Sequence, residues 1–290
     1  MSMIGCHALV FSGVFDRAGF EKSARITRES GFDLLELVMM DPFTFDVKTA
    51  RDVLGKEDLA LSASLGLDLT TDVSSEDPEV VARGEAVLNR VLDILHELEA
   101  QYLVGVIYSA LTKYSQPSTE LGRQHSADVM RRIGERAQSL GIKVGLEVVN
   151  RYETNIMNTS KQGLAFVNQV DHPNVGVHLD TYHMNIEEPD MFQPVLDAAD
   201  KLFYVHVGES HRGYLGSGTV DFDNFFRALH RVGYSGPITF ESFSSEVVEP
   251  DLSIALAIWR DLWSDSADLA GHANSFIRSM QKSVEAIQFQ

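Results

Sequence analysis

The chain has 290 residues, 44% of them hydrophobic and 23% charged, which is the composition of an ordinary folded protein. It carries 42 acidic against 24 basic residues, and a formal net charge of −18 excludes nucleic acids and anionic membrane surfaces as expected partners. The chain has a single cysteine, Cys6, and therefore cannot form an internal disulfide. It also has no run of roughly 18 apolar residues and no basic segment before the first apolar run, so we expect a cytoplasmic protein without membrane contact.

Short apolar segments alternate with longer amphipathic segments along the whole chain. The apolar segments are rich in β-branched residues, which predicts strands, and the amphipathic segments have a helical period. Several strand candidates are apolar on both faces, as strands of a parallel sheet are when helices cover them. In chain order, the eight strand candidates are residues 4–11, 33–38, 59–67, 101–109, 143–149, 175–180, 202–207 and 237–241.

Eight regular strand-helix units favour closure into a (β/α)8 barrel, the TIM barrel of the α/β class. A doubly wound open sheet would show the same alternation, but the glycine-rich turn that usually follows its first strand is missing. Glycines at Gly31, Gly141 and Gly233 precede strand candidates, and we expect each to end a helix in the left-handed conformation. Because no linker-like tract interrupts the pattern, residues 1–290 are expected to form one domain.

Two amphipathic segments follow the eighth strand, which is one more than the barrel requires. Residues 250–265 and 267–287 are each expected to form a helix, and the extra helix to cap the barrel or serve an interface. Trp259 and Trp263 are four residues apart, a spacing that predicts a packing stripe on the first of these helices.

Four residues with metal-ligating side chains lie at or near the ends of four successive strand candidates: Glu147, Asp180, His206 and Glu241. Their separations of 33, 26 and 35 residues resemble the about 31 residues per unit of a barrel of about 250 residues. A single carboxylate there is more often a helix cap, but four in phase are expected to converge at the barrel mouth. Three carboxylates around one imidazole would repel one another without a cation. Three oxygens and one nitrogen suit one divalent cation, Mn²⁺ first, with Co²⁺ or Mg²⁺ as alternatives.

Four segments of the second half also carry a family resemblance. They are GLEVVNRYETN at 145–155, HLDTYHMNIEE at 178–188, HVGESHRGYLGSG at 206–218 and ITFESF at 238–243. They resemble the corresponding stretches of the D-tagatose 3-epimerase family, which includes the D-psicose and L-ribulose 3-epimerases. The resemblance spans essentially the whole chain and is densest from 145 to 245.

The resemblance implies a role for each site residue. The four metal ligands of the family match the four strand-end residues, and Glu147 and Glu241 are in addition the acid/base pair. Residues that match the family's substrate contacts are Glu153, His183 and Arg212. Apart from the resemblance, His7 and Gly66 are also expected to contact the substrate, His7 because it lies on the first strand candidate. The resemblance also implies a free ketose as substrate and a homo-oligomer, either a dimer or a tetramer.

These observations predict a metal-dependent isomerase, a ketose 3-epimerase of free ketohexoses or ketopentoses. Pairs such as D-fructose and D-psicose, D-tagatose and D-sorbose, or ribulose and xylulose would be interconverted. Epimerisation at C3 removes one proton and returns another to the opposite face, through an enediolate whose charge must be stabilised. One carboxylate on each face suffices, and Glu147 and Glu241 would each act as acid or base according to the epimer bound.

Departures from the family pattern concern substrate preference. Ala110 and Leu111 stand where psicose-type members have aromatic residues, and Ser242 stands where the family has proline. A reshaped wall near the far end of the sugar should alter contacts to C5 and C6. We therefore expect a relaxed or pentulose-leaning preference.

Other functions fit parts of the pattern. An aldose-ketose isomerase or an inosose dehydratase would use a comparable metal site on the same barrel, and a non-catalytic sugar-binding protein would keep the fold. An endonuclease IV-like phosphodiesterase needs a histidine-rich mouth with several zinc ions, which the chain lacks. Among the other histidines, His178 is expected to be a hydrogen-bonded core residue, His183 to lie in a loop and His211 at the surface.

Overall fold

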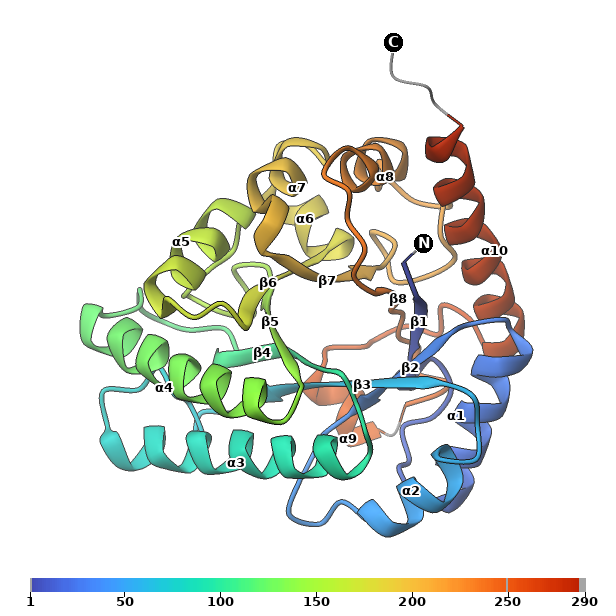
Figure 1. Cartoon of the computed structure of the whole chain (residues 1–290). Helices are drawn as coiled ribbons and strands as arrows, with labels where there is room; N and C mark the ends of the chain where they lie inside the picture. Colours follow the sequence, from blue (N-terminus) through green and yellow to red (C-terminus); the bar gives the residue numbers. More distant parts are fainter. Residues whose placement is uncertain (1, 249, 287–290) are drawn as a thin grey trace.

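The computed structural model describes residues 2–248 and 250–286 and has at its centre a closed barrel of parallel strands (Figure 1). Each strand pairs with its neighbours in chain order, and the eighth closes on the first, where Cys6 is in register with Phe240. The predicted TIM barrel is therefore confirmed. Its strands are β1 (Ile4–His7), β2 (Leu34–Val38), β3 (Ala60–Leu67), β4 (Tyr102–Ala110), β5 (Lys143–Val148), β6 (Val175–Asp180), β7 (Leu202–Val207) and β8 (Ile238–Phe240).

Helices surround the barrel, and most begin at an aspartate or threonine whose side chain accepts a hydrogen bond from a backbone N–H of the first turn. The three glycines expected to end helices, Gly31, Gly141 and Gly233, all have positive φ angles. The helices are α1 (Arg17–Glu29), α2 (Val47–Leu54), α3 (Pro78–Glu97), α4 (Glu120–Ser139), α5 (Ser160–Val170), α6 (Thr181–Glu187), α7 (Gln193–Ala198), α8 (Phe222–Arg231), α9 (Pro250–Ala255) and α10 (Ser266–Glu285), with 3₁₀ turns η1 (Ala8–Val10) and η2 (Ala199–Lys201).

The first strand is shorter than expected. β1 ends at His7, and η1 follows because the His7 side chain accepts the backbone N–H of Leu9 and turns the chain. His183 lies on α6 and not in a loop, since Asp180 caps that helix directly after β6.

The chain after β8 differs from the prediction in two ways. α9 covers residues 250–255 alone, and Ala257 adopts a left-handed conformation with a φ of 53°, so the expected helix to residue 265 is wrong. The predicted packing stripe is also wrong, because Trp259 is 70% exposed whereas Trp263 is 5% exposed.

The second expected helix is α10, whose predicted end at residue 287 lies outside the described residues. α10 packs between α8 and α1 and completes the ring, so the extra C-terminal helix is α9 (Figure 1).

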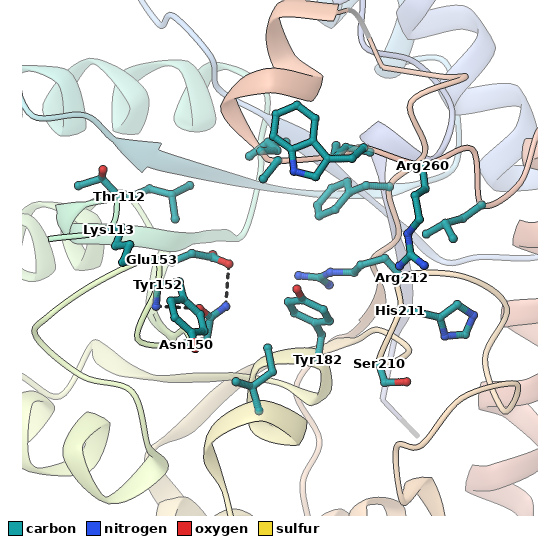
Figure 2. Close-up of a pocket in the computed structure, with 18 residues that line it drawn as sticks. Thr112, Lys113, Asn150, Tyr152, Glu153, Tyr182, Ser210, His211, Arg212 and Arg260 are labelled. Atoms are coloured by element: carbon teal, nitrogen blue, oxygen red, sulfur yellow. Dashed lines mark hydrogen bonds between the residues drawn. The ribbon is translucent and has the colours of Figure 1, made fainter.

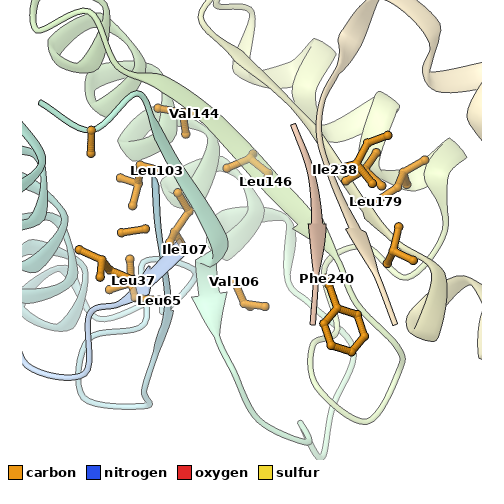
Figure 3. Close-up of a cluster of buried hydrophobic side chains, with 14 of the residues drawn as sticks. Leu37, Leu65, Leu103, Val106, Ile107, Val144, Leu146, Leu179, Ile238 and Phe240 are labelled. Atoms are coloured by element: carbon orange, nitrogen blue, oxygen red, sulfur yellow. The ribbon is translucent and has the colours of Figure 1, made fainter. Parts of the chain in front are cut away.

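Apolar side chains of the strands fill the space between the barrel and its helices (Figure 3). Along β2, Leu35 and Leu37 belong to this layer, whereas the alternate residue, Glu36, points into the barrel. The inward residues form a polar layer around the Tyr204 hydroxyl, which donates to Glu36 at 2.7 Å and lies 2.8 Å from the hydroxyls of both Ser62 and Thr239. No helix in the described part of the chain is long and apolar enough to span a membrane.

Candidate metal centre and active site

The four predicted metal ligands meet at the carboxyl end of the barrel. Glu147 lies on β5, Asp180 ends β6, His206 lies on β7 and Glu241 directly follows β8. All four are buried, and one ligand atom from each lies within 4.8 Å of those of the others. His206 Nδ1 is 3.7 Å from Glu147 Oε1 and 3.5 Å from Glu241 Oε1. The four residues thus form an acidic cage, a name that we keep for this set.

Two buried atoms of the acidic cage fit a cation. Asp180 Oδ2 and His206 Nδ1 have no hydrogen-bond partner among the described residues. The other oxygen of Asp180 already caps α6 by accepting the N–H of Tyr182 at 2.8 Å. Buried polar atoms that make no hydrogen bond cost free energy, and a cation held by these two atoms and the two glutamates would satisfy them.

Glu36 is a residue of the site that we did not predict from the sequence. Its carboxylate oxygens lie 3.0 and 2.9 Å from His206 Nε2, which fixes Nε2 as the donor and turns Nδ1 toward the acidic cage. Burial raises the pKa of Glu36, but the charge and hydrogen bonds of His206 outweigh burial and lower it. The sequence gives one indication of this role, a single acidic residue within the apolar segment LLELV.

The two candidate acid/base residues have pKa values shifted in opposite directions. Burial and the neighbouring carboxylates of Glu241 and Asp180 raise the pKa of Glu147. Burial also acts to raise the pKa of Glu241, but the positive charges of Arg212, the largest contributor, and of His206, His7 and His183 together outweigh burial and lower the pKa of that carboxyl. Two carboxyls with such different proton affinities are typical of sites where one group holds a proton and the other accepts one.

Arg212 connects the acidic cage to the solvent-facing cavity. Its Nη1 lies 2.6 Å from Glu241 Oε2 and 3.1 Å from Asp180 Oδ2, and its side chain is 12% exposed. The guanidinium carbon is 3.9 Å from the centre of the Tyr182 ring and 5.0 Å from that of Phe243. The two aromatic rings and the carboxylates therefore hold the guanidinium in one orientation.

His183 and Glu153 are joined by Asn150, another residue that we did not predict. The backbone N–H of Asn150 donates to His183 Nδ1 at 3.2 Å, and its amide nitrogen lies 2.9 Å from Nδ1 and 2.7 Å from Glu153 Oε1. Burial lowers the pKa of His183 to about 4, so the ring is neutral near pH 7. With Nδ1 as acceptor, Nε2 carries the hydrogen and points at Asp180 and Glu147, 3.6 and 3.7 Å away.

His7 and Gly66 are the remaining expected substrate contacts. His7 Nε2 is 3.2 Å from Ser64 Oγ and 3.6 Å from Glu241 Oε1, so this side chain adjoins the acidic cage. Gly66 lies against Leu111, since a Cβ at Gly66 would come within 2.6 Å of the Leu111 side chain. Leu111 therefore occupies the space in front of Gly66.

His178 differs from its predicted environment. The ring is buried, but neither nitrogen has a hydrogen-bond partner among the described residues, so the expectation of a hydrogen-bonded core histidine is wrong. Its Nδ1 is 3.9 Å from Glu147 Oε2, and its ring packs edge-on against His206. Burial lowers the pKa of His178 well below its ordinary value, which keeps the ring neutral.

A cavity of about 570 Å³ leads outward from Arg212 (Figure 2). Glu153, Asn150 and Tyr152 line one side, and Tyr182 and Arg212 face them across the opening. His211, expected at the surface, is partly buried and lines the cavity as well. This volume, with a few converging polar groups, is typical of small-molecule sites.

Comparison with known proteins agrees with the sequence resemblance. The chain matches the family of xylose isomerase-like TIM barrels over residues 24–277. A ketose 3-epimerase of Arthrobacter globiformis is 58% identical, with 98% of this chain and 99% of the relative covered. An L-ribulose 3-epimerase of Methylomonas sp. strain DH-1 is 52% identical, with 94% and 96% covered. The crystal structure of a D-allulose 3-epimerase from Methylomonas sp. in complex with D-allulose has a TM-score of 0.94 at 51% identity, with 96% and 97% covered. The chain therefore belongs to the xylose isomerase-like TIM barrel family and, within it, to the ketose 3-epimerases, which are isomerases.

Proposed function

We propose that this protein epimerises free ketoses at C3 with the help of one divalent cation, Mn²⁺ in preference to Co²⁺ or Mg²⁺. One observation carries the proposal: buried atoms of Asp180 and His206 that make no hydrogen bond lie close to two glutamates whose pKa values are shifted in opposite directions. The three carboxylates and one imidazole would hold the cation. When bound, it would supply Lewis-acid stabilisation of negative charge on the sugar oxygens.

The reaction needs one proton acceptor and one proton donor on opposite faces of C3. In the proposed mechanism one of Glu147 and Glu241 removes the C3 proton, and the electron pair of the C–H bond becomes part of an enediolate. The other glutamate then returns a proton to the opposite face, which inverts the configuration. Either residue serves as the base, according to the epimer that is bound.

The neighbouring residues would orient the sugar and stabilise its charge. Arg212 and the Nε2–H of His183 point into the acidic cage and would donate hydrogen bonds to the oxygens near C2 and C3. Glu153, partly exposed at the cavity wall, would accept a hydrogen bond from a hydroxyl of the substrate. His7 lies beside Glu241 and would contact the sugar from the β1 side.

Substrate preference depends on the wall beyond the reacting carbons. Leu111 lines the cavity and packs against Gly66, where an apolar side chain offers no hydrogen bond to a distal hydroxyl. This contact supports a relaxed preference between ketopentoses and ketohexoses, and relatives are named for L-ribulose and for D-psicose. The homo-oligomer and the cytoplasmic location stay predictions.

Product analysis tests the proposal. The protein is incubated with Mn²⁺ and single ketoses, namely D-fructose, D-tagatose, D-ribulose and L-ribulose, and the products are separated by chromatography. We expect the C3 epimer of the added sugar as the first product. An aldose as the sole product would instead identify an aldose-ketose isomerase, and binding without any product would identify a sugar-binding protein.

A further inference from the structure

Ser242 directly follows Glu241 and is fully buried, so its side chain does not reach the cavity. Its hydroxyl makes two hydrogen bonds to distant parts of the chain. It donates to the backbone carbonyl of Arg212, and it accepts the indole N–H of Trp263 at 2.8 Å. The one donor of this hydroxyl and one of its two acceptor sites are therefore in use.

Arg212 needs such support because its backbone is in an unfavourable conformation. Its φ angle is 60°, in the left-handed region that residues with a side chain seldom adopt. The backbone N–H donates to the carbonyl of Glu209 at 2.9 Å, and the Ser242 hydroxyl bonds the carbonyl on the other side of the same residue. The two hydrogen bonds fix both peptide groups of Arg212, and hence the direction in which its side chain leaves the backbone.

Trp263 anchors this arrangement. It lies in the segment before α10 and is 5% exposed, so its indole ring has a fixed position in the core. Because its indole N–H donates to the Ser242 oxygen, the Ser242 hydroxyl proton is available to donate to the Arg212 carbonyl. One oxygen atom thus joins the segment before α10, the end of β8 and the loop between β7 and α8.

We propose that Ser242 is a positioning residue for Arg212: held by Trp263, its hydroxyl sets the backbone from which the guanidinium reaches Glu241 and the substrate oxygens. The inference rests on the proposed function, in which Arg212 binds those oxygens. A proline at this position, as the family resemblance leads one to expect, would offer no hydroxyl to either partner.

Ser244 provides a matched control. It is also fully buried, and its hydroxyl also makes a hydrogen bond to Trp263, at 2.7 Å, but to the backbone carbonyl. We expect Ser242→Ala to lower kcat/KM about tenfold, the factor that corresponds to roughly one buried hydrogen bond. Ser244→Ala should change kcat/KM by less than about threefold, while both variants lose thermal stability to a similar extent.

A double-mutant cycle separates positioning from a general loss of packing. In an Arg212→Ala background, the rate of C3–H exchange should fall no further when Ser242→Ala is added, because there is no guanidinium left to orient. Trp263→Phe keeps an aromatic ring and removes the N–H, and it should lower kcat/KM in the same direction even if Ser242→Ala folds poorly. The unfolding temperature of each metal-free variant reports folding independently of activity.

Two results would overturn the inference and leave the proposed function intact. In the first, the wild type is active but Ser242→Ala changes kcat/KM no more than Ser244→Ala does. In the second, Ser242→Ala lowers the rate of C3–H exchange by the same factor with and without the Arg212 side chain. A wild-type protein that exchanges no C3 hydrogen on any ketose would overturn the proposed function, and the role of Ser242 with it.

Discussion

Replacing Glu36 by glutamine should weaken cation binding although Glu36 is not a member of the acidic cage. The carboxylate accepts hydrogen bonds from His206 Nε2 and from the Tyr204 hydroxyl at 2.7 Å, in a fully buried layer. Glutamine has nearly the same shape but carries no charge, and its NH₂ group would face one of these two donors. His206 would then be held less firmly with Nδ1 toward the acidic cage.

The expected loss of metal affinity follows from comparable sites in other proteins. Carboxylates that orient a ligating histidine are worth about 10- to 100-fold in metal affinity. That range corresponds to about 1.4–2.8 kcal/mol of binding free energy. Ser62→Ala is the matched control, because Ser62 bonds the same Tyr204 hydroxyl at 2.8 Å but is not hydrogen-bonded to His206.

Calorimetric titration of Mn²⁺ into metal-stripped protein measures the effect directly. We expect a dissociation constant at least tenfold higher for Glu36→Gln, and a change below about threefold for Ser62→Ala. Equal affinity of Glu36→Gln and wild type would refute the argument that Glu36 orients His206. Equal losses in both variants would show that the polar layer matters as a whole and that the charge at Glu36 does not.

Further outcomes follow from the same geometry. Glu147→Gln and Glu241→Gln should each lower kcat by about 10²–10⁴-fold with the circular dichroism spectrum unchanged; a variant that keeps over half of its activity would not be the acid or base. Burial raises the pKa of Glu147, so the metal-free folded state holds a proton that the unfolded state has lost above the ordinary glutamate range. Stability of the metal-free protein should therefore fall as pH rises from the ordinary glutamate range to the raised pKa of about 8. Over the same window Mn²⁺ should bind more tightly and release protons, as titrations in buffers of different ionisation enthalpy would show. Asn150→Ala removes the amide contacts to His183 Nδ1 and Glu153 Oε1 and leaves only the backbone N–H of residue 150 on Nδ1, so kcat/KM measured at saturating Mn²⁺ should drop about tenfold; an unchanged value would exclude the Asn150 side chain as their link.

The barrel and the meeting of its four strand-end residues follow from patterns that are local in sequence. Strands apolar on both faces and helix-ending glycines mark each unit, and Glu147, Asp180, His206 and Glu241 recur at nearly the spacing of those units. Parallel strands of one barrel end at the same face. Residues at the same position in successive strand-helix units therefore lie close together in the barrel.

Glu36 and Asn150 could not be assigned in this way because their roles depend on partners far away in sequence. Glu36 contacts His206, 170 positions later, and a single acidic residue in an apolar strand does not reveal its partner. The segment after α9 was mispredicted for another reason. Its apolar residues have helical spacing, but Ala257 is left-handed and Trp263 is fixed by its hydrogen bond to Ser242, so tertiary contacts override the local pattern.

Incorporation of solvent deuterium at C3 tests the central claim most directly. The protein is incubated in D₂O with Mn²⁺ and L-ribulose, and the recovered sugars are examined by NMR. We predict that the C3 epimer forms with one deuterium at C3 and none at C1, and that Glu147→Gln forms no labelled epimer. Epimer without label at C3, or label confined to C1, would contradict proton transfer at C3 by the two glutamates.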